Sequence, residues 1–445
     1  GVWGFARVLR LEHQAMRTAC ADVLCRASLI ASIMTTLAPT NETEAACISP
    51  LQLVARLRAH SLSSAVSSTA PAYGTYTVTG GLGGLGMRAA TLLAEGNASR
   101  VLLASRTGRV VRDGQDVEAQ LLSMGAVATA VAGDSADALA VVAFLSGSPF
   151  NGVLHAAGVG DRGLLIELAA RTVQWMYASK ALGAWHLQCA AATTPLATRV
   201  LFSSVGSALG NVGQANYAAG NACLDAHALF QRAHGKVACS LQWPLVGGAG
   251  MGAAAFAAVG ERQVSMAGLA GILLEEYAAC LKSQLASSGD PACSVRLVHR
   301  SDVRRLLQDL AEPLQPRFGE LVAQSRHSLA NDDPAPVVTA PAHSDTLVHA
   351  LTHVDDILDF LVDELKPLVV GFSDSELQAD LLLMDGGLDS LALGALSGAV
   401  RRATGQSFNI AQVQDRLHPY VHRFRQIHHV YLSDSNCSLH LTASV

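Results

Sequence analysis

The stretch TYTVTGGLGGLG at residues 75–86 decides the fold of this chain. A short β-branched run ends in a glycine-rich turn, and a run rich in Ala and Leu follows, as expected of a helix. Glycines here allow a tight turn and a close approach of the backbone to a pyrophosphate, while a helix start offers unpaired N–H groups. The stretch therefore predicts a dinucleotide site. Its expected contacts are Thr79, Gly80, Gly81, Leu82, Gly83, Gly84, Leu85 and Gly86.

The alternative for this turn is an ordinary flexible loop. A strand before it, a helix after it and a second strand ending about 20 residues later argue against that alternative. Around it, β-branched runs alternate with helical patterns that begin, for example, at Gly84, Ser135 and Gly213. This alternation predicts an α/β fold with a Rossmann-type doubly wound parallel sheet, covered by helices on both faces. The predicted strands are 75–79, 100–104, 126–131, 152–155, 199–203 and 237–242.

The composition narrows the class of protein. With 445 residues, half of them hydrophobic, the chain has room for two or three domains with a sizeable core. A net charge of −5 and a sequence pI near 6.3 give no reason to expect a nucleic-acid or polybasic membrane surface. No apolar run reaches the roughly 18 to 20 residues that span a bilayer.

Nine cysteines are scattered without paired spacing, which favours free thiols in a reducing compartment over disulfides or a zinc site. We therefore expect no metal and a cytoplasmic location. Because the chain begins with Gly1 rather than Met, we expect it to be part of a longer protein, and an organellar leader stays open as an alternative.

The second predicted strand ends in Ala104-Ser105-Arg106. A fold that prefers NAD usually places Asp or Glu there to hold the ribose 2′-hydroxyl. Arg106 instead offers a cation with planar donors, which suits a 2′-phosphate. We therefore expect NADPH as the cofactor, with a solvated surface arginine as the alternative.

Longer motifs point to a family. They are TGGLGGLG at 79–86, SRTG at 105–108, Asp134, HAAGV at 155–159, SKALGAWHL at 179–187 and FSSVGSALGNVGQANYAAGNACLDA at 202–226. The region that carries them resembles the short-chain dehydrogenase/reductase superfamily and, within it, the ketoreductase domains of modular polyketide synthases. The resemblance spans most of residues 75–243.

The resemblance implies reduction of a β-ketoacyl thioester to a β-hydroxyacyl thioester. It assigns Tyr217 as the proton donor and Ser204 as the hydroxyl that holds the carbonyl, with Lys180 and Asn221 completing a tetrad. Hydride delivery to a ketone leaves charge on oxygen, which needs hydrogen-bond donors and a proton. A nearby ammonium favours the ionised form of a tyrosine, whose pKa is ordinarily near 10. Cofactor contacts beyond the glycine turn are expected at Ser105, Arg106, Asp134, His155, Ala156, Ala157 and Gly158.

Tyr217 and Asn221 stand at i and i+4 and so share one helix face. Most of the superfamily has lysine at the second position, whereas asparagine there with lysine upstream is typical of polyketide ketoreductases. A tyrosine that merely packs in a helix is the alternative. Two positions that report stereochemistry in the family depart from its patterns. Gly160-Asp161-Arg162 replaces Leu-Asp-Asp, and Leu209 stands where a tryptophan would indicate the opposite outcome. The configuration of the product therefore stays open.

The N-terminal stretch GVWGFARVLRLEH at 1–13 resembles the end of the non-catalytic subdomain that precedes these reductases, with an unrelated amphipathic helix as the alternative. We expect residues 1–70 to hold a truncated remnant of that subdomain and a linker. Residues 71–327 would form the catalytic domain, 328–349 a proline-rich linker, 350–432 an acyl carrier domain built as a small all-α four-helix bundle, and 433–445 a polar tail.

The carrier prediction depends on MDGGLDSL at 384–391, which resembles the acyl carrier signature. By this resemblance Ser390 receives 4′-phosphopantetheine from a phosphopantetheinyl transferase, and Asp389 is well placed to cap the helix there. The alternative is that both residues only cap a structural helix. Carriers usually continue with an aromatic-acidic-aromatic-proline stretch, whereas QDRLHPY stands at 414–420.

Three hypotheses follow. The first is an enzyme module that reduces a β-ketoacyl chain tethered to Ser390, beside neighbouring domains of a polyketide or fatty acid synthase. The second is a carrier and scaffold piece with an inactive reductase. The third is a free-standing short-chain dehydrogenase that acts on a small ketone or alcohol.

Overall fold

The computed structural model describes residues 1–13, 16, 18–23, 42–48, 51–58, 73–109, 119, 123–124, 127–146, 149–160, 163–248, 265–266, 269–286, 295–298 and 315–323. All of them lie in one compact unit, Gly1–Val338. The predicted linkers, the carrier region 350–432 with Ser390, and the tail 433–445 lie outside these residues, as do Asp161 and Arg162. No helix in the described segments is long and apolar enough to cross a membrane.

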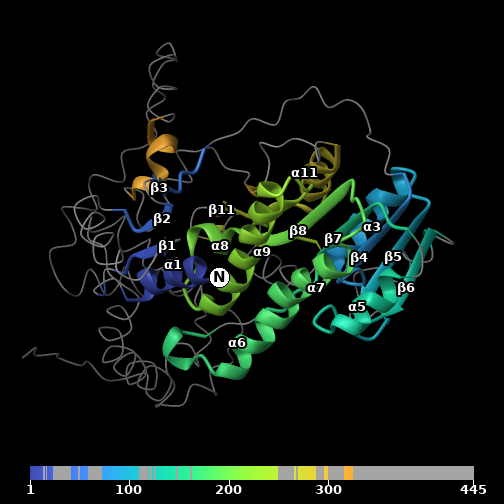
Figure 1. Ribbon diagram of the computed structural model, residues 1–445, viewed down its shortest axis with the longest axis horizontal. Coiled ribbons are helices and arrows are strands. Elements are labelled where there is room, and N and C mark those ends of the chain that lie inside the picture. Colours follow the sequence, from blue (N-terminus) through green and yellow to red (C-terminus); the bar gives the residue numbers. More distant parts are fainter. Residues whose placement is uncertain are drawn as a thin grey trace, which may run out of the picture. The chain divides into compact units, whose positions relative to one another are not determined.

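A seven-stranded sheet with every neighbouring pair parallel forms the centre of the unit (Figure 1). Its order is β12-β9-β8-β7-β4-β5-β6. The predicted Rossmann-type fold is thereby confirmed. The strands are β4 (Thr75–Thr79), β5 (Arg100–Ser105), β6 (Ala128–Ala132), β7 (Gly152–His155), β8 (Thr198–Ser204), β9 (Cys239–Trp243) and β12 (Val295–Leu297).

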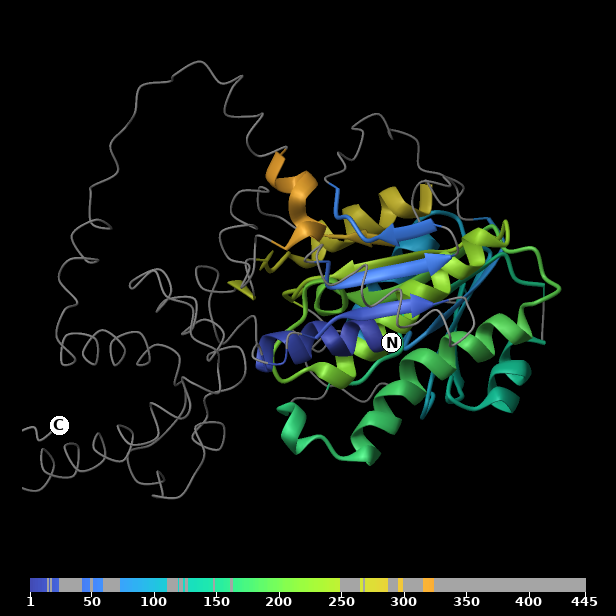
Figure 2. The same cartoon turned by 60° about the vertical axis from the view of Figure 1, so that its left-hand side comes forward.

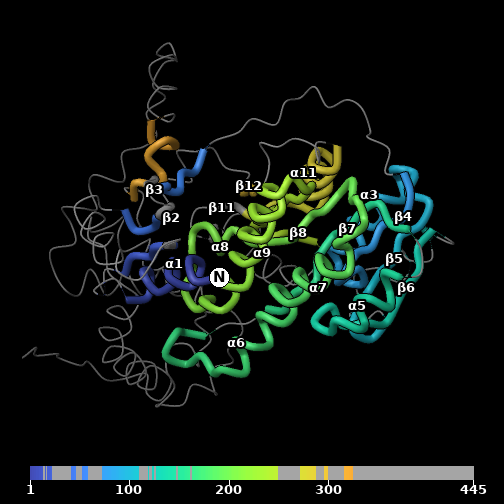
Figure 3. The backbone as a smooth tube through the Cα atoms, in the orientation of Figure 1, coloured from blue at the N-terminus to red at the C-terminus, as the bar shows by residue number. Residues whose placement is uncertain are grey.

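Helices cover both faces of this sheet, as the tube in Figure 3 shows. On one face, α3 (Gly84–Glu95) and α11 (Leu274–Ala286) bury Met87, Leu93 and Tyr277 against apolar strand residues. On the other face, α5 (Ala138–Leu145) and α7 (Gly183–Ala190) cover one part of the sheet. The helix α9 (Ala215–Ala233) covers the part around β8 and β9. Burial on both faces explains the near-continuous apolar runs of the strands.

The strand order reverses at β4, which lies between β5 and β7. In open α/β sheets ligands bind at such a switch point, beyond the carboxyl ends of the strands. The glycine turn follows β4, and the stretches after β5, β6, β7 and β8 reach the same edge because the strands are parallel. The fold thus collects most of the predicted site residues along one edge.

The N-terminal segment forms helix α1 (Val2–Glu12) and a small sheet of β1 (Cys20–Val23), β2 (Glu44–Ile48) and β3 (Leu51–Val54). The strands β1 and β2 pair in parallel, and β2 and β3 pair antiparallel. Figures 1 and 2 show α1 lying against α9 and against α8 (Val205–Leu209). A side chain on Gly4 would collide with Ala218 and Ala222 of α9, so glycine allows the two helices to approach closely.

Several boundaries differ from the sequence prediction. The helix expected to begin at Ser135 begins at Ala138, because Asp137 caps it by accepting hydrogen bonds from the N–H groups of Leu139 and Ala140. The strand β12 was not predicted, and neither were β1–β3 or the two-residue strands β10 (Ser265–Met266) and β11 (Leu269–Ala270). These strands have two to five residues each, and pairing with a neighbour rather than the local sequence decides whether they form.

Candidate active site

The glycine turn is built by contacts that leave no room for side chains. Gly80 has φ +68°, and a Cβ atom on it would lie 2.7 Å from the backbone of Ala157. A Cβ atom on Gly81 would lie 2.7 Å from the Val78 carbonyl oxygen, and one on Gly86 would collide with the carbonyl oxygen of Gly80. The Gly81 N–H donates to the Ala104 carbonyl at 3.2 Å, which ties the turn to the end of β5.

The start of α3 is free to hold an anion. Its N-cap, Gly83, is exposed and has no side chain to accept from the first N–H groups of the helix. A helix N-terminus of this kind combines unpaired donors with the positive end of the helix dipole. Leu82 and Leu85 pack in the core instead, and the Leu85 carbonyl accepts a hydrogen bond from the Tyr277 hydroxyl at 2.8 Å. Only the backbone of these two leucines is available to a ligand.

Two predicted cofactor residues follow the neighbouring strands. Arg106 is exposed after β5, and no protein group pairs with it within the described segments. Asp134 is exposed after β6, where its carboxylate accepts the N–H of Ala136 at 2.9 Å. The Ser105 hydroxyl accepts the N–H of Gly108 at 3.1 Å. Arg106 thus follows the strand whose end is tied to the glycine turn by the hydrogen bond between Gly81 and Ala104.

His155 ends β7, at the sheet edge where the cofactor is expected. Its side chain is fully buried, and burial together with the charge of Lys180 lowers its pKa to about 3. The neutral ring therefore donates from Nε2 to the Lys180 carbonyl at 3.1 Å and accepts from the Thr79 hydroxyl at Nδ1, at 2.7 Å. The side chain thereby connects β4 to the helix that carries Lys180.

The residues after His155 pack against their neighbours. The Ala156 N–H donates to the Thr79 carbonyl at 3.0 Å, and Ala157 faces Gly80. A Cβ atom on Gly158 would lie 2.6 Å from Cε of Lys180. Gly158 therefore makes room for the lysine side chain.

Lys180 lies in a π-helical turn, η6 (Ala178–Leu182), between α6 (Ala170–Tyr177) and α7. Such turns occur often at functional sites. The side chain is buried, and its Nζ donates to the Phe202 carbonyl at 2.9 Å and lies 5.9 Å from the ring centroid of Tyr217. Burial lowers the pKa of Lys180 from 10.5 to about 8, and the charge of Asp225 partly offsets that shift.

Ser204, Tyr217 and Asn221 come together beside this lysine. Ser204 ends β8 and caps α8, while Tyr217 and Asn221 share a face of α9. Burial raises the pKa of Tyr217, and hydrogen bonds from the Ser204 and Asn221 side chains partly offset that rise. The phenol is therefore protonated at neutral pH. The Oδ1 atom of Asn221 is buried and has no partner in the described part of the chain, so it remains available as an acceptor for a bound water.

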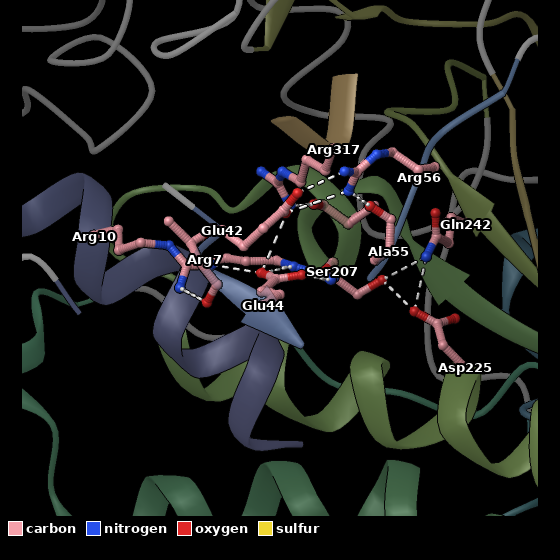
Figure 4. Close-up of polar contacts among 12 residues, drawn as sticks. Arg7, Arg10, Glu42, Glu44, Ala55, Arg56, Ser207, Asp225, Gln242 and Arg317 are labelled. Atoms are coloured by element: carbon pink, nitrogen blue, oxygen red, sulfur yellow. Dashed lines mark hydrogen bonds and ion pairs between the residues drawn. The ribbon is translucent and has the colours of Figure 1, made fainter. Parts of the chain in front are cut away.

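A buried polar network adjoins Ser204 and Asn221, and Figure 4 draws its members Asp225, Ser207 and Gln242. The carboxylate of Asp225 accepts from the hydroxyls of Ser207 and Ser240, each at 2.6 Å, and from Nε2 of Gln242 at 2.8 Å. The Ser207 hydroxyl oxygen also lies 2.7 Å from the Ser204 carbonyl oxygen, so its single proton can be donated to either acceptor. The network holds the end of β8 and α9 together, and its carboxylate raises the pKa of Lys180.

Helix α1 extends the network through an ion cluster, also drawn in Figure 4. Arg7 forms two hydrogen bonds with the Glu44 carboxylate and donates to the Ser207 carbonyl. Arg10 pairs with the same carboxylate, and Arg317 lies 3.9 Å from it. Burial alone would raise the pKa of Glu44, but Arg7, Arg317 and Arg10 outweigh it and hold the pKa below its ordinary value.

The sequence prediction did not include Asp225 or the residues of α1 in the site. One signal was present, because Asp225 stands four residues after Asn221 and therefore shares its helix face. No comparable signal marks Arg7 and Glu44, since their contacts arise from packing between distant segments. Among the residues described, no group of three or more His, Cys, Asp or Glu side chains is placed to hold a metal ion.

Comparison with known proteins identifies the family that shares this geometry. Residues 74–248 match the family model of the KR domain. A solved structure of A-type ketoreductases from a modular polyketide synthase superposes with a TM-score of 0.63 at 30% identity, over 72% of this chain and 69% of that chain. The chain belongs to this ketoreductase family. Its homologues in the family are oxidoreductases that form part of multidomain polyketide synthases.

Two curated relatives of the ketoreductase come from Streptomyces orinoci. The spectinabilin polyketide synthase system protein NorB is 40% identical over 220 residues, which make up 48% of this chain and 10% of NorB. The system protein NorA′ is 31% identical over 416 residues, which make up 91% of this chain and 11% of NorA′. The ketoreductase chain thus spans about a tenth of the length of either relative.

Proposed function

We propose that this ketoreductase uses NADPH to reduce the β-keto group of an acyl thioester to a β-hydroxyl group. One observation carries the proposal. The side chains of Ser204, Tyr217 and Asn221 meet beside the Lys180 ammonium, at the sheet edge where the uncapped glycine turn begins α3. Hydrogen-bond donors for a developing oxyanion and a dinucleotide cradle thereby share one edge.

The donor groups fit the proposed cofactor. The unpaired N–H groups at the start of α3 would hold the pyrophosphate, the free guanidinium of Arg106 the 2′-phosphate, and the segments after β6 and β7 the remaining parts. When bound, NADPH supplies the hydride that the carbonyl carbon takes up. The Ser204 hydroxyl would donate a hydrogen bond to the carbonyl oxygen, and Tyr217 would deliver the proton that completes the alcohol. The Lys180 ammonium would favour the phenolate left behind.

The purified chain, incubated with NADPH and a β-ketoacyl thioester of N-acetylcysteamine, is expected to oxidise one NADPH for each alcohol formed. Measurement of absorbance at the nicotinamide band and chromatography of the product give both quantities. NADPH binding without turnover of any ketone would favour a scaffold with an inactive reductase. Reduction of small ketones but not of thioesters would favour a free-standing dehydrogenase.

Replacing Arg106 by glutamine is expected to raise the KM for NADPH about 10- to 100-fold and to leave the KM for NADH within about twofold. The reason is that a charge-assisted contact to the 2′-phosphate exists only with NADPH. Steady-state kinetics with both cofactors measure the change. Arg100→Gln is the matched control, because Arg100 begins the same strand at the opposite edge of the sheet. Equal losses for NADPH and NADH in Arg106→Gln would contradict the assignment.

The rate is expected to fall as pH rises through about 8, where Lys180 loses its proton. A neutral amine no longer favours the Tyr217 phenolate. The titration of Lys180 does not itself favour unfolding there, because the cost of burying its charge is progressively relieved as the pH rises from about 8 to 10.5. Profiles of kcat/KM against pH, with thermal melts at each pH, test this. A flat profile from pH 7 to 10 would argue against a charged lysine in the reaction.

We further propose that residues 350–432 form an acyl carrier domain with 4′-phosphopantetheine on Ser390, joined by a linker at 328–349 to a catalytic domain at 71–327. The 91% coverage in the NorA′ alignment supports a synthase-like region beyond the KR match. The partners would be a phosphopantetheinyl transferase, neighbouring synthase domains and a carrier-bound β-ketoacyl thioester.

Incubation of the chain with a phosphopantetheinyl transferase and coenzyme A is expected to add the mass of one phosphopantetheine arm. Intact-mass spectrometry detects the gain, and peptide mapping locates it. The variant Ser390→Ala should gain nothing. A wild-type chain that stays unmodified would remove the carrier assignment and leave the reductase proposal intact.

A further inference from the structure

Glu12, at the end of α1, joins two segments of the catalytic half. Its side chain is buried, with 4% of the residue exposed. One carboxylate oxygen accepts the N–H of Gly213 at 2.8 Å, and the other accepts the N–H of Leu165 at 2.8 Å. Both bonds join α1 to segments that are distant from it in sequence.

The first of these segments runs from Gly163 into the short turn η5 (Leu165–Glu167) that precedes α6. The second connects α8 to α9 and therefore leads from Ser204 to Tyr217. They also touch each other, because the Gly163 N–H donates to the Gly213 carbonyl at 2.9 Å. Glu12 and this bond together set the distance between the segments.

Burying the Glu12 carboxylate here costs free energy, because a charged group loses its hydration. No Lys or Arg side chain pairs with Glu12 among the described residues. The two backbone N–H groups therefore offset most of the free-energy cost of removing the carboxylate from water. A glutamine has only one acceptor oxygen and would face one of the two N–H groups with its own donor. The two acceptor oxygens of glutamate therefore suit the joining of two backbone donors.

The joined segments border the positions that differ from the family patterns. Gly160 precedes the first segment by three residues, and Leu209 ends the helix before the second. Leu209 is buried with Val205 and Phe318. Gly213 stands four residues before Tyr217, so the bond from Glu12 fixes the chain where it enters the helix that carries Tyr217.

We propose that Glu12 is a positioning residue that holds these two segments together, sets the place of Tyr217 at the start of α9, and so determines which face of the ketone is presented for reduction. The proposal rests on the proposed function. It assigns part of the stereochemical control to α1, outside the region that matches the KR model.

The test uses the full chain with a β-ketobutyryl thioester of N-acetylcysteamine and NADPH, followed by chiral chromatography of the alcohol. In Glu12→Gln the ratio of minor to major enantiomer is expected to rise about tenfold. The KM for the thioester should rise more than kcat falls, and the affinity for NADPH should stay within twofold. Glu95→Gln makes the same change on the exposed side of α3 and should alter none of these quantities.

An unchanged enantiomer ratio and KM in Glu12→Gln would overturn the inference while the reductase proposal stands. No reduction by the wild-type chain would overturn both. If Glu12→Gln does not fold, Glu12→Asp takes its place in the same assay, because it keeps both acceptor oxygens on a side chain that is one methylene shorter. An unchanged enantiomer ratio and KM in a folded Glu12→Asp would overturn the inference.

Discussion

Replacing Tyr217 by phenylalanine is expected to lower NADPH-dependent reduction of a β-ketoacyl thioester about 10²- to 10⁴-fold. The substitution removes one oxygen atom. The ring keeps its place on α9, but the hydroxyl beside Ser204 and Asn221 is lost, and with it the proton for the developing alkoxide. The affinity for NADPH should change little, because the glycine turn and Arg106 are untouched. Single-turnover rates and a fluorescence titration with NADPH measure the two effects separately.

Tyr73→Phe provides the matched control, since Tyr73 is exposed and precedes β4. It makes the same chemical change and should leave the rate within about twofold. A Tyr217→Phe enzyme with a wild-type rate would show that the proton comes from another group. A loss of folding in Tyr217→Phe, detected by a thermal melt, would instead indicate that the hydroxyl mainly stabilises α9.

Gly80→Ala is expected to abolish NADPH binding and to lower the free energy of unfolding by about 3 kcal/mol. Two penalties act together. A left-handed backbone costs an L-residue about 1–2 kcal/mol, and the new Cβ atom would lie 2.7 Å from the Ala157 backbone. Because backbone atoms cannot rotate away, the turn or the strand β7 has to shift. Such a shift would displace the N–H groups that begin α3. Denaturant unfolding and an NADPH titration measure both effects.

Gly235→Ala separates the two penalties. Gly235 has φ +71°, close to the +68° of Gly80, but nothing lies within 4 Å of its added Cβ atom. It should therefore lose only about 1–2 kcal/mol and bind NADPH normally. Equal destabilisation in both variants would mean that backbone strain alone accounts for the loss of stability in Gly80→Ala. Normal NADPH binding by Gly80→Ala would mean that the close approach to Ala157 has no role in cofactor binding.

The central sheet was the most predictable part of this protein. The strands β4 and β7 have the predicted bounds, and four more lie within about two residues of theirs, because buried parallel strands leave long β-branched runs in the sequence. The strand β12 was missed since its three residues owe their structure to pairing with β9. The predicted tetrad does come together in space, and the motif residues made that possible to anticipate.

Partners of the tetrad were harder to anticipate. His155 was expected among the cofactor residues, but the partners of its ring, Thr79 and the Lys180 carbonyl, could not be read from the sequence. Glu12 and Asp225 stand in helical patterns where a charged residue ordinarily faces water. Only the tertiary packing of α1 on α9, and of α9 on the sheet, buries them. Local periodicity carries no information about which distant backbone groups will meet a carboxylate.

The contacts of α1 also have a consequence for how the chain is made. Arg7 bonds Ser207 and Glu12 bonds Gly213, across 200 and 201 residues of sequence. A ribosome adds about 5–20 residues per second, so α1 emerges on the order of 10–40 s before its partners do. During that interval its buried side chains, including Val8, have no sheet or helix of the catalytic half to cover them. Helix α1 therefore docks only after its partners have been made, and the surroundings of Tyr217 are complete only when α1 meets segments that are synthesised about 200 residues later.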